Sequence, residues 1–166
     1  MWLLDVDGVV NAFESLGDER FETAMANDFV ITWDRTLTDR LHNLHLSGRV
    51  EIRWLTTWAD DANVFISPLF GWSELTVSGA PDYGREWWKL RYAIAVVEQE
   101  HRRLIWTDDD IRHDPAAFAW LRSLPAARVT WLATDPAHGL THADLDAIEA
   151  WLDRDSPPAG ETAPDN

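Results

Sequence analysis

Residues 2–10 read WLLDVDGVV. The apolar run Trp2 to Leu4 has the length and composition of a short buried strand, and two aspartates, Asp5 and Asp7, follow it directly. Two carboxylates this close repel each other unless one takes up a proton or a cation binds between them. The stretch therefore predicts a strand that ends in a chemically active acidic pair.

Further short apolar runs alternate with segments of helical spacing along the rest of the chain. The predicted strands after the first are 51–58, 75–77, 103–107 and 128–133, and the predicted helices are 36–46, 59–65, 86–100, 115–124 and 141–153. Residues 20–33 predict a β-hairpin that turns at Ala26-Asn27-Asp28. The alternation predicts an α/β, three-layer Rossmann-like domain over residues 1–154, with a central parallel sheet of about five strands and helices on both faces. Residues 155–166 have the composition of a disordered tail.

Polar side chains follow several of these strands at the point where each strand ends. Thr56 and Thr57 end the second strand, and Asp108 and Asp109 follow the strand 103–107. Lys89 lies near the start of the helix after the third strand. The carboxyl ends of parallel strands meet at one edge of a sheet, so we expect these groups to lie together with the first acidic pair.

The residue types at this edge indicate a particular chemistry. Clustered carboxylates need a cation, and hard oxygen ligands favour Mg²⁺, which binds one or two carboxylates, waters and a substrate phosphate. A carboxylate nucleophile, a second carboxylate, a hydroxyl and a lysine are the groups that phosphoryl transfer through an aspartyl-phosphate requires.

The order and spacing of these motifs resemble those of the haloacid dehalogenase (HAD) superfamily, whose members are mostly Mg²⁺-dependent phosphatases. The four motifs are DVDGV at 5–9, a hydrophobic strand ending in Thr at 52–56, a helical lysine at 89 and a strand ending in acidic residues at 105–109. The resemblance covers all of the chain except the tail, and it implies a HAD-type fold and phosphatase activity.

The resemblance implies a role for each carboxylate. Asp5 is the expected nucleophile, and Asp7 is the expected general acid, which then acts as the base on the attacking water. The expected Mg²⁺ ligands are the carboxylate of Asp5, the backbone carbonyl of Asp7 and Asp108, with Asp109 bound through water or supporting the site.

The resemblance also implies how the phosphate is bound. Thr56 is the expected hydrogen-bond partner of a phosphoryl oxygen, and Thr57 is the alternative because the strand end is uncertain by one residue. Lys89 is expected to neutralise the charge of the phosphate and the nucleophile. Gly8 is expected to let the backbone turn sharply beside the phosphate.

Each motif alone has a plainer interpretation. Asp-x-Asp-Gly also occurs in simple turns and calcium loops, although the EF-hand pattern places its glycine at another position. Lys89 alone would be an ordinary solvated helix charge, and the acidic run from Asp108 to Asp110 would suit the start of a helix. Their common position at the strand ends favours the shared site.

The spacing between motifs leaves no room for a second folded unit. A separate cap domain needs about 50 residues or more, and neither the segment 11–50 nor 58–88 offers that beyond its own predicted elements. We therefore expect a capless, open site that suits large substrates without excluding small ones. Five of the tryptophans lie near this edge, where they either fill the groove or stack on an aromatic part of the substrate: Trp33, Trp58, Trp72, Trp87 and Trp88.

The composition restricts the classes of molecule that the protein is expected to bind. The net charge of −15 disfavours non-specific binding to nucleic acid or to anionic membranes. There is no cysteine and no apolar run of about 18 residues, and too few residues precede DVDG for a secretory signal, so we expect a cytoplasmic protein. The expected substrate is a phosphorylated small molecule or macromolecule. The alternatives are a phosphotransferase, a nucleic-acid-end phosphatase, or a binding module that has lost turnover.

Overall fold

A five-stranded parallel sheet forms the centre of the protein. The computed structural model describes residues 1–15, 17, 19–82, 84 and 87–154. The strand order is β5-β4-β1-β6-β7, and every neighbouring pair is parallel. The strands are β1 (Trp2–Leu4), β4 (Ile52–Trp54), β5 (Thr76–Val77), β6 (Leu104–Thr107) and β7 (Val129–Leu132). The prediction of an α/β, Rossmann-like sheet of five parallel strands is confirmed.

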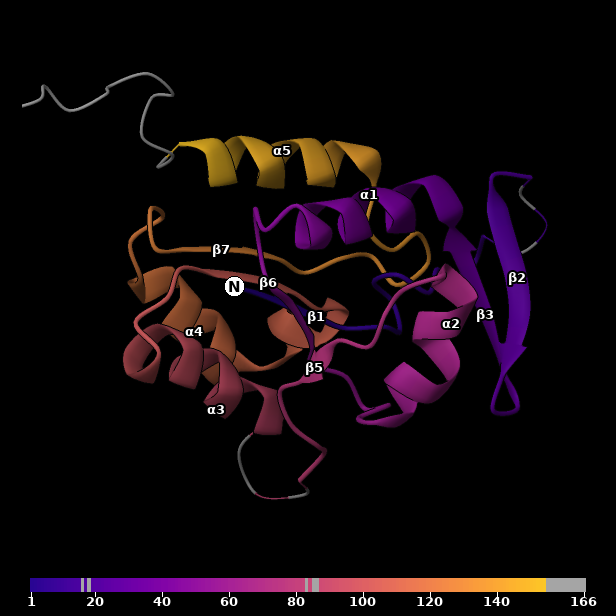
Figure 1. The fold of residues 1–166 in the computed structure, drawn as a ribbon. Coiled ribbons are helices and arrows are strands. Elements are labelled where there is room, and N and C mark those ends of the chain that lie inside the picture. Colours follow the sequence, from indigo (N-terminus) through magenta and orange to yellow (C-terminus); the bar gives the residue numbers. More distant parts are fainter. Residues whose placement is uncertain (16, 18, 83, 85–86, 155–166) are drawn as a thin grey trace, which may run out of the picture.

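Alternate residues of the strands pack into two hydrophobic cores, one on each face of the sheet. Trp2 and Leu4 pack into the core below α1 (Arg35–Leu46) and α5 (His142–Asp153). Leu3 points to the opposite core, which α3 (Trp88–Ile94) and α4 (Pro115–Ser123) cover. Figure 1 shows these two pairs of helices on opposite sides of the sheet. The expected layers, with helices on both faces, are therefore present.

The helices begin and end where the sequence provides caps. The Asp34 side chain accepts the backbone N–H of Leu37 at the start of α1, and Gly48 follows its end with a φ of 73°. Thr141 and Asp144 form a reciprocal capping box at the start of α5.

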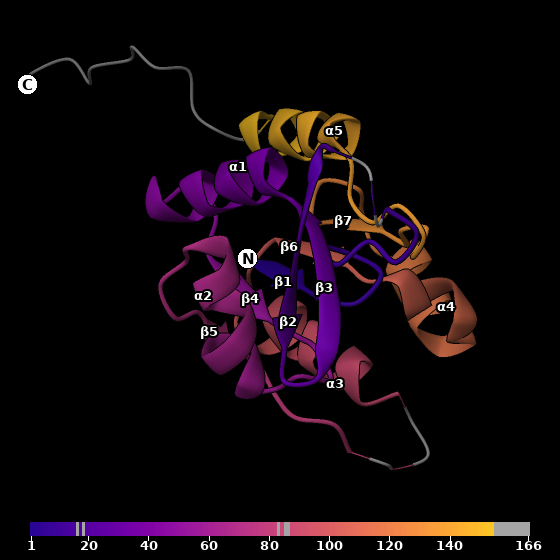
Figure 2. The ribbon, with the colours of Figure 1, turned by 90° about the vertical axis from the view of Figure 1, so that its right-hand side faces the viewer.

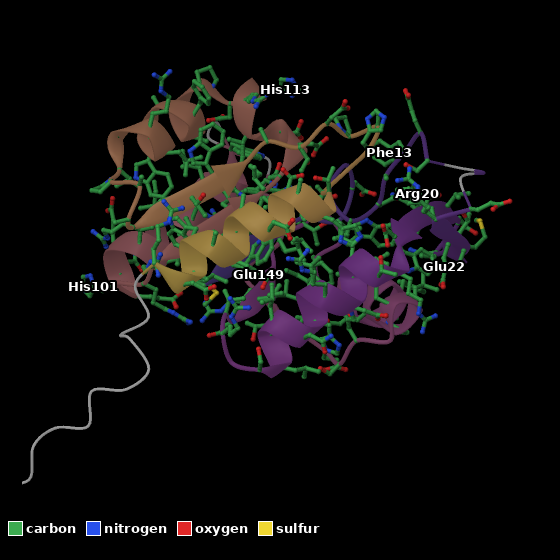
Figure 3. The ribbon with its side chains drawn as sticks, turned by 90° about the horizontal axis from the view of Figure 1, so that it is seen from above. Phe13, Arg20, Glu22, His101, His113 and Glu149 are labelled. Carbon is green, nitrogen blue, oxygen red and sulfur yellow. The ribbon has the colours of Figure 1, made fainter. Side chains whose placement is uncertain are left out.

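An ion-pair cluster joins α5 to α1 and the loop after it. Arg40 pairs with Asp146 and Glu149, each at 2.6 Å. Arg49 pairs with the same glutamate at 2.8 Å and with Asp153 at 2.7 Å. Figure 3, which looks down on these two helices, shows Glu149 between them.

The predicted hairpin consists of β2 (Phe21–Ala26) and β3 (Phe29–Asp34). Its turn residues Asn27 and Asp28 have φ values of 43° and 67°, the left-handed conformation that a two-residue hairpin turn requires. β1 runs toward this hairpin in Figure 1, and Figure 2 shows the hairpin in front of β1 and β6, so it stands across the carboxyl end of the sheet.

Several strands and helices begin or end at other residues than the sequence predicts. The strand predicted over 51–58 covers only Ile52–Trp54, because the chain turns after Leu55 and Ala59 has a φ of 47°. The helix predicted over 59–65 is instead a π-helical turn, Ala62–Ile66, followed by α2 (Ser67–Phe70) with Pro68 in its first turn.

The helix predicted over 86–100 is α3 followed by a π-helical segment, Ala95–Gln99, and Glu86 lies outside the described residues. The predicted tail, 155–166, also lies outside them. Over the described part of the chain, every helix is too short or too polar to cross a membrane.

Candidate active site

Asp5 and Asp108 are neighbours at the carboxyl edge of the sheet. Leu4 pairs with Thr107 in the β1–β6 register, and the next residue on each strand is one of the two aspartates. The backbone N–H of Asp5 donates to the Thr107 carbonyl at 3.2 Å, which continues the ladder beyond the strand ends. Both side chains are buried. The sheet therefore holds two carboxylates side by side, away from water.

Lys89 lies between these two carboxylates. The first turn of α3 brings its ammonium group into contact with Asp5 Oδ2 and to 2.6 Å from Asp108 Oδ2. Only 3% of the lysine side chain is exposed. It is also the only lysine in the sequence, all other cationic side chains apart from histidine being arginine. A compact point charge fits between two oxygens that a planar guanidinium would have to separate.

The buried charges shift one another's ionisation. Burial alone would lower the pKa of Lys89, but the carboxylates of Asp5 and Asp108 outweigh it and raise that pKa above its usual value. Burial raises the pKa of Asp108 well above its usual range, and the charge of Asp5 adds to the rise. The charged lysine therefore lies beside Asp108, a carboxylate that is costly to keep ionised in this buried position.

A third carboxylate, Asp109, completes a candidate metal-binding group. Asp5, Asp108 and Asp109 each offer a carboxylate oxygen, and these oxygens lie within 4.8 Å of one another. Burial, followed by the charges of Asp110 and Asp5, raises the pKa of Asp109 to about 6. Clustered carboxylate oxygens are hard ligands, so this donor set suits a divalent cation such as Mg²⁺.

Gly8 lies directly against this group. Its φ is 67°, and a Cβ at this position would lie 2.5 Å from Asp109 Oδ2. Its carbonyl accepts a hydrogen bond of 2.7 Å from the Thr134 hydroxyl. Glycine is therefore required here both for the turn and for the close approach to Asp109, in agreement with the sharp turn predicted from the sequence.

Asp7 lies outside the three-carboxylate group and has its own hydrogen-bond partners. Its Oδ1 accepts the Asn11 amide at 2.8 Å, and its Oδ2 accepts the Trp58 indole N–H at 2.9 Å. Asn11 in turn accepts the backbone N–H of Thr32 at 2.9 Å, which connects Asp7 to the hairpin. The two donors fix the direction of the Asp7 carboxylate.

The roles of Asn11 and Trp58 were not predicted. A signal for Asn11 exists, since a polar residue that is buried four positions after Asp7 needs a nearby partner. The contact of Trp58 with Asp7 depends on the turn after β4, and no local sequence pattern predicts that turn.

The two candidate threonines occupy different environments. Thr56 is fully buried, and its hydroxyl accepts the backbone N–H of Trp58 at 3.4 Å. Thr57 is exposed and lines a cavity of about 310 Å³ beside Asp7. Each hydroxyl stays a candidate for the phosphate contact.

The predicted residues thus separate into two adjacent groups. Asp5, Lys89, Asp108 and Asp109 form the buried charged group, with Gly8 against it. Asp7 and Thr57 line the neighbouring cavity. The remaining lining consists of Asn27, Phe29, Trp58 and Asp61.

The tryptophans near this edge divide between core and cavity. Trp33, Trp72 and Trp88 are buried and fill the two cores, as the packing interpretation expects. Trp87 is partly buried and stacks on Trp106 with ring centres 5.2 Å apart. Of these five, only Trp58 lines the cavity beside Asp7.

Comparison with protein-family models, with curated proteins and with solved structures finds no match to this chain. The chemistry of the site is therefore the basis for the functional proposal.

Proposed function

We propose that the protein is a Mg²⁺-dependent phosphomonoester hydrolase that works through an aspartyl-phosphate, with a HAD-type, capless active site. The observation that carries the proposal is the buried contact of Lys89 with Asp5 and Asp108 at the carboxyl edge of the sheet. Burying such a group costs stability, and perturbed, buried charges of this kind are concentrated at functional sites.

Asp5 supplies the nucleophile. Its Oδ1 accepts the backbone N–H of Val6 at 2.7 Å, and its Oδ2 faces Lys89. These contacts hold the carboxylate in one orientation, which lowers the entropic cost of in-line attack on phosphorus. Lys89 offsets the negative charge that the attacking carboxylate and the phosphoryl oxygens bring together.

Asp7 transfers the proton in both steps of the reaction. It is partly buried and borders the cavity, so a leaving-group oxygen can approach it from that side. In the first step Asp7 protonates the departing oxygen, and in the second it takes a proton from the water that releases phosphate. The bonds from Asn11 and Trp58 keep it in position for both steps.

The carboxylates of Asp5, Asp108 and Asp109 would hold Mg²⁺, together with the backbone carbonyl of Asp7. When bound, the ion supplies Lewis-acid stabilisation of charge on the phosphoryl oxygens. The donor set fits this role because its oxygens are already gathered, and a bound cation would add to the charge compensation that Lys89 provides.

The hydrolysis of a generic aryl phosphate, with and without Mg²⁺, tests this proposal. We expect Mg²⁺-dependent turnover that Asp5→Asn lowers on the order of 10³-fold or more, as loss of a nucleophile does elsewhere. The matched control is Asp146→Asn, which removes an exposed carboxylate on α5 that belongs neither to the three-carboxylate group nor to the cavity beside Asp7. Equal activity in wild type and Asp5→Asn would refute the mechanism.

A second readout identifies the intermediate. Acid quenching during turnover should leave a phosphate adduct on the peptide that contains Asp5, and Asp7→Asn should increase its amount because the hydrolysis of the intermediate needs Asp7. Comparison of water with added alcohols as the acceptor separates a hydrolase from a phosphotransferase.

A further inference from the structure

We propose that the cavity beside Asp7 binds a planar aromatic ring carried by the leaving group of the substrate. This proposal rests on the proposed function, because it assigns the substrate class of the same site. The cavity measures about 310 Å³, which is at the lower end of the range for small-molecule sites.

The position of Phe29 is the first observation. Phe29, Ile31 and Trp33 share one face of β3, and the latter two are buried in the core. Phe29 continues that face beyond the edge of the core, so that 62% of it is exposed. Phe29 lines the cavity, and its exposed aromatic ring offers a surface for a ligand ring. So exposed a side chain adds little to the hydrophobic core.

The second observation is that Phe29 and Trp58 already form an aromatic corner. Their ring centres are 5.6 Å apart and their planes meet at 75°, an edge-to-face arrangement. Trp58 is held by its bond to Asp7 Oδ2 at 2.9 Å and packs against the core. The corner thus has one fixed wall and one wall on the hairpin, and a flat ring can contact both.

Asp7 determines how far the ring lies from the reacting bond. Since Asp7 protonates the leaving oxygen, that oxygen must lie within hydrogen-bond distance of its carboxylate. The same carboxylate lines the cavity and accepts the Trp58 indole. A ring one carbon from the oxygen therefore lies in the cavity beside Asp7, where it can contact the aromatic corner.

The charge of the lining restricts the ring further. Asp7 and Asp61 are the charged groups of the cavity, and no arginine or lysine occurs among its described lining residues. With a net charge of −15 over the whole chain, the cavity disfavours a ring that carries a carboxylate or phosphate. The expected substrate has a neutral or cationic ring.

Benzyl phosphate and cyclohexylmethyl phosphate provide a matched pair of probes. Both have a primary alcohol as leaving group, and they differ in whether the six-membered ring is aromatic and flat. We expect wild type to prefer benzyl phosphate in kcat/KM by about three- to ten-fold, the range for one aromatic contact. Phe29→Ala should reduce this ratio toward one.

Val30→Ala is the matched control. Val30 is the next residue on the same strand, is 50% exposed and pairs with Met25 on the opposite face of the hairpin. It should keep the wild-type ratio. A wild-type ratio of one, or an unchanged ratio in Phe29→Ala, would overturn the proposal. Equal kcat/KM for benzyl phosphates with and without a para carboxylate would overturn the charge restriction.

A binding measurement separates this proposal from the proposed function. In the Asp5→Asn variant, the indole N–H resonance of Trp58, assigned by its loss in Trp58→Phe, should shift with benzyl phosphate more than with cyclohexylmethyl phosphate. If neither compound is hydrolysed by wild type, the phosphatase proposal fails, and this resonance still decides the ring site. No difference between the two titrations would overturn the ring site.

Discussion

Replacement of Lys89 by methionine should destabilise the protein strongly and in a pH-dependent way. The substitution keeps an unbranched side chain but leaves the carboxylates of Asp5 and Asp108, 7% and 0% exposed, without their shared cation. Removing one partner of a buried ion pair costs about 3–5 kcal/mol. We expect about 3 kcal/mol at pH 7, the lower limit, because one carboxyl group can relieve the repulsion by taking up a proton.

The pH dependence follows from the direction of the shifts. Burial and the charge of Asp5 raise the pKa of Asp108 even with the lysine present, and loss of Lys89 raises it further. An acid with a raised folded-state pKa destabilises the protein above that pKa, and the penalty disappears below its unfolded value. The raised pKa of Lys89 itself changes nothing between pH 5 and 7, since the lysine is charged throughout. The cost of Lys89→Met should therefore shrink as the pH falls from 7 to 5.

Urea denaturation of wild type and variant at both pH values measures these costs. Arg91→Met is the control: it removes a cation from the same helix, and because the ion pair of Arg91 with Asp82 at 2.6 Å is half exposed, this variant should be much less destabilised than Lys89→Met. Adding Asp108→Asn to Lys89→Met should recover part of the loss. A cost below about 1 kcal/mol for Lys89→Met, or the same cost at pH 5 and 7, would refute the reasoning.

Three further predictions concern Gly8, the metal ligand Asp109 and the ion-pair cluster between α1 and α5. Gly8→Ala should lower the free energy of unfolding by about 1–2 kcal/mol because of its positive φ, and by more because the added Cβ meets Asp109. The control Gly48→Ala has a φ of 73° and nothing within 4 Å of the added Cβ, so urea denaturation should show only the first of these costs. Mg²⁺ affinity measured by calorimetry should weaken below about pH 6, because the raised pKa of Asp109 neutralises that ligand there, and Asp109→Asn should abolish this step. Glu149→Gln should cost about 1 kcal/mol at pH 7. Burial opposes ionisation of Glu149, but hydrogen bonds from its arginine partners lower its pKa, so its contribution should be present above pH 4.5 and be lost as the pH falls through the folded value. A Glu149→Gln cost that persists unchanged at low pH would contradict this assignment.

The sheet and the buried charged group could be predicted because each depends on a local pattern and one general rule. Apolar runs such as Trp2 to Leu4 identify the strands, and the carboxyl ends of parallel strands share an edge. That rule places Asp5 and Asp108 at the same edge, and the pairing of β1 with β6 makes them neighbours. The prediction of Lys89 needed only its helix to follow the third strand, and its status as the sole lysine would have strengthened it.

The surroundings of Asp7 could not be predicted because they depend on irregular backbone. Asn11 reaches Asp7 through a turn in which its own N–H bonds to the Val6 carbonyl at 2.9 Å. Trp58 reaches Asp7 because β4 ends early and the chain turns at Ala59, which has a positive φ. A glycine or asparagine at this position would have indicated such a turn, but an alanine does not. The same turn separates Thr56 from Thr57, so the strand pattern could not choose between them.

Because Lys89 is the only lysine in the sequence, amine chemistry can label a single side chain of this protein. A reagent that acylates amines can modify one side chain only, and that side chain is almost inaccessible while it contacts Asp5 and Asp108. The rate of acylation of Lys89 therefore measures how often the site opens to solvent. Reductive methylation with ¹³C labels the amino group of Met1 as well, but Lys89 is the one side chain that it modifies, and its methyl signal would report the protonation of the two carboxylates and the arrival of a metal ion.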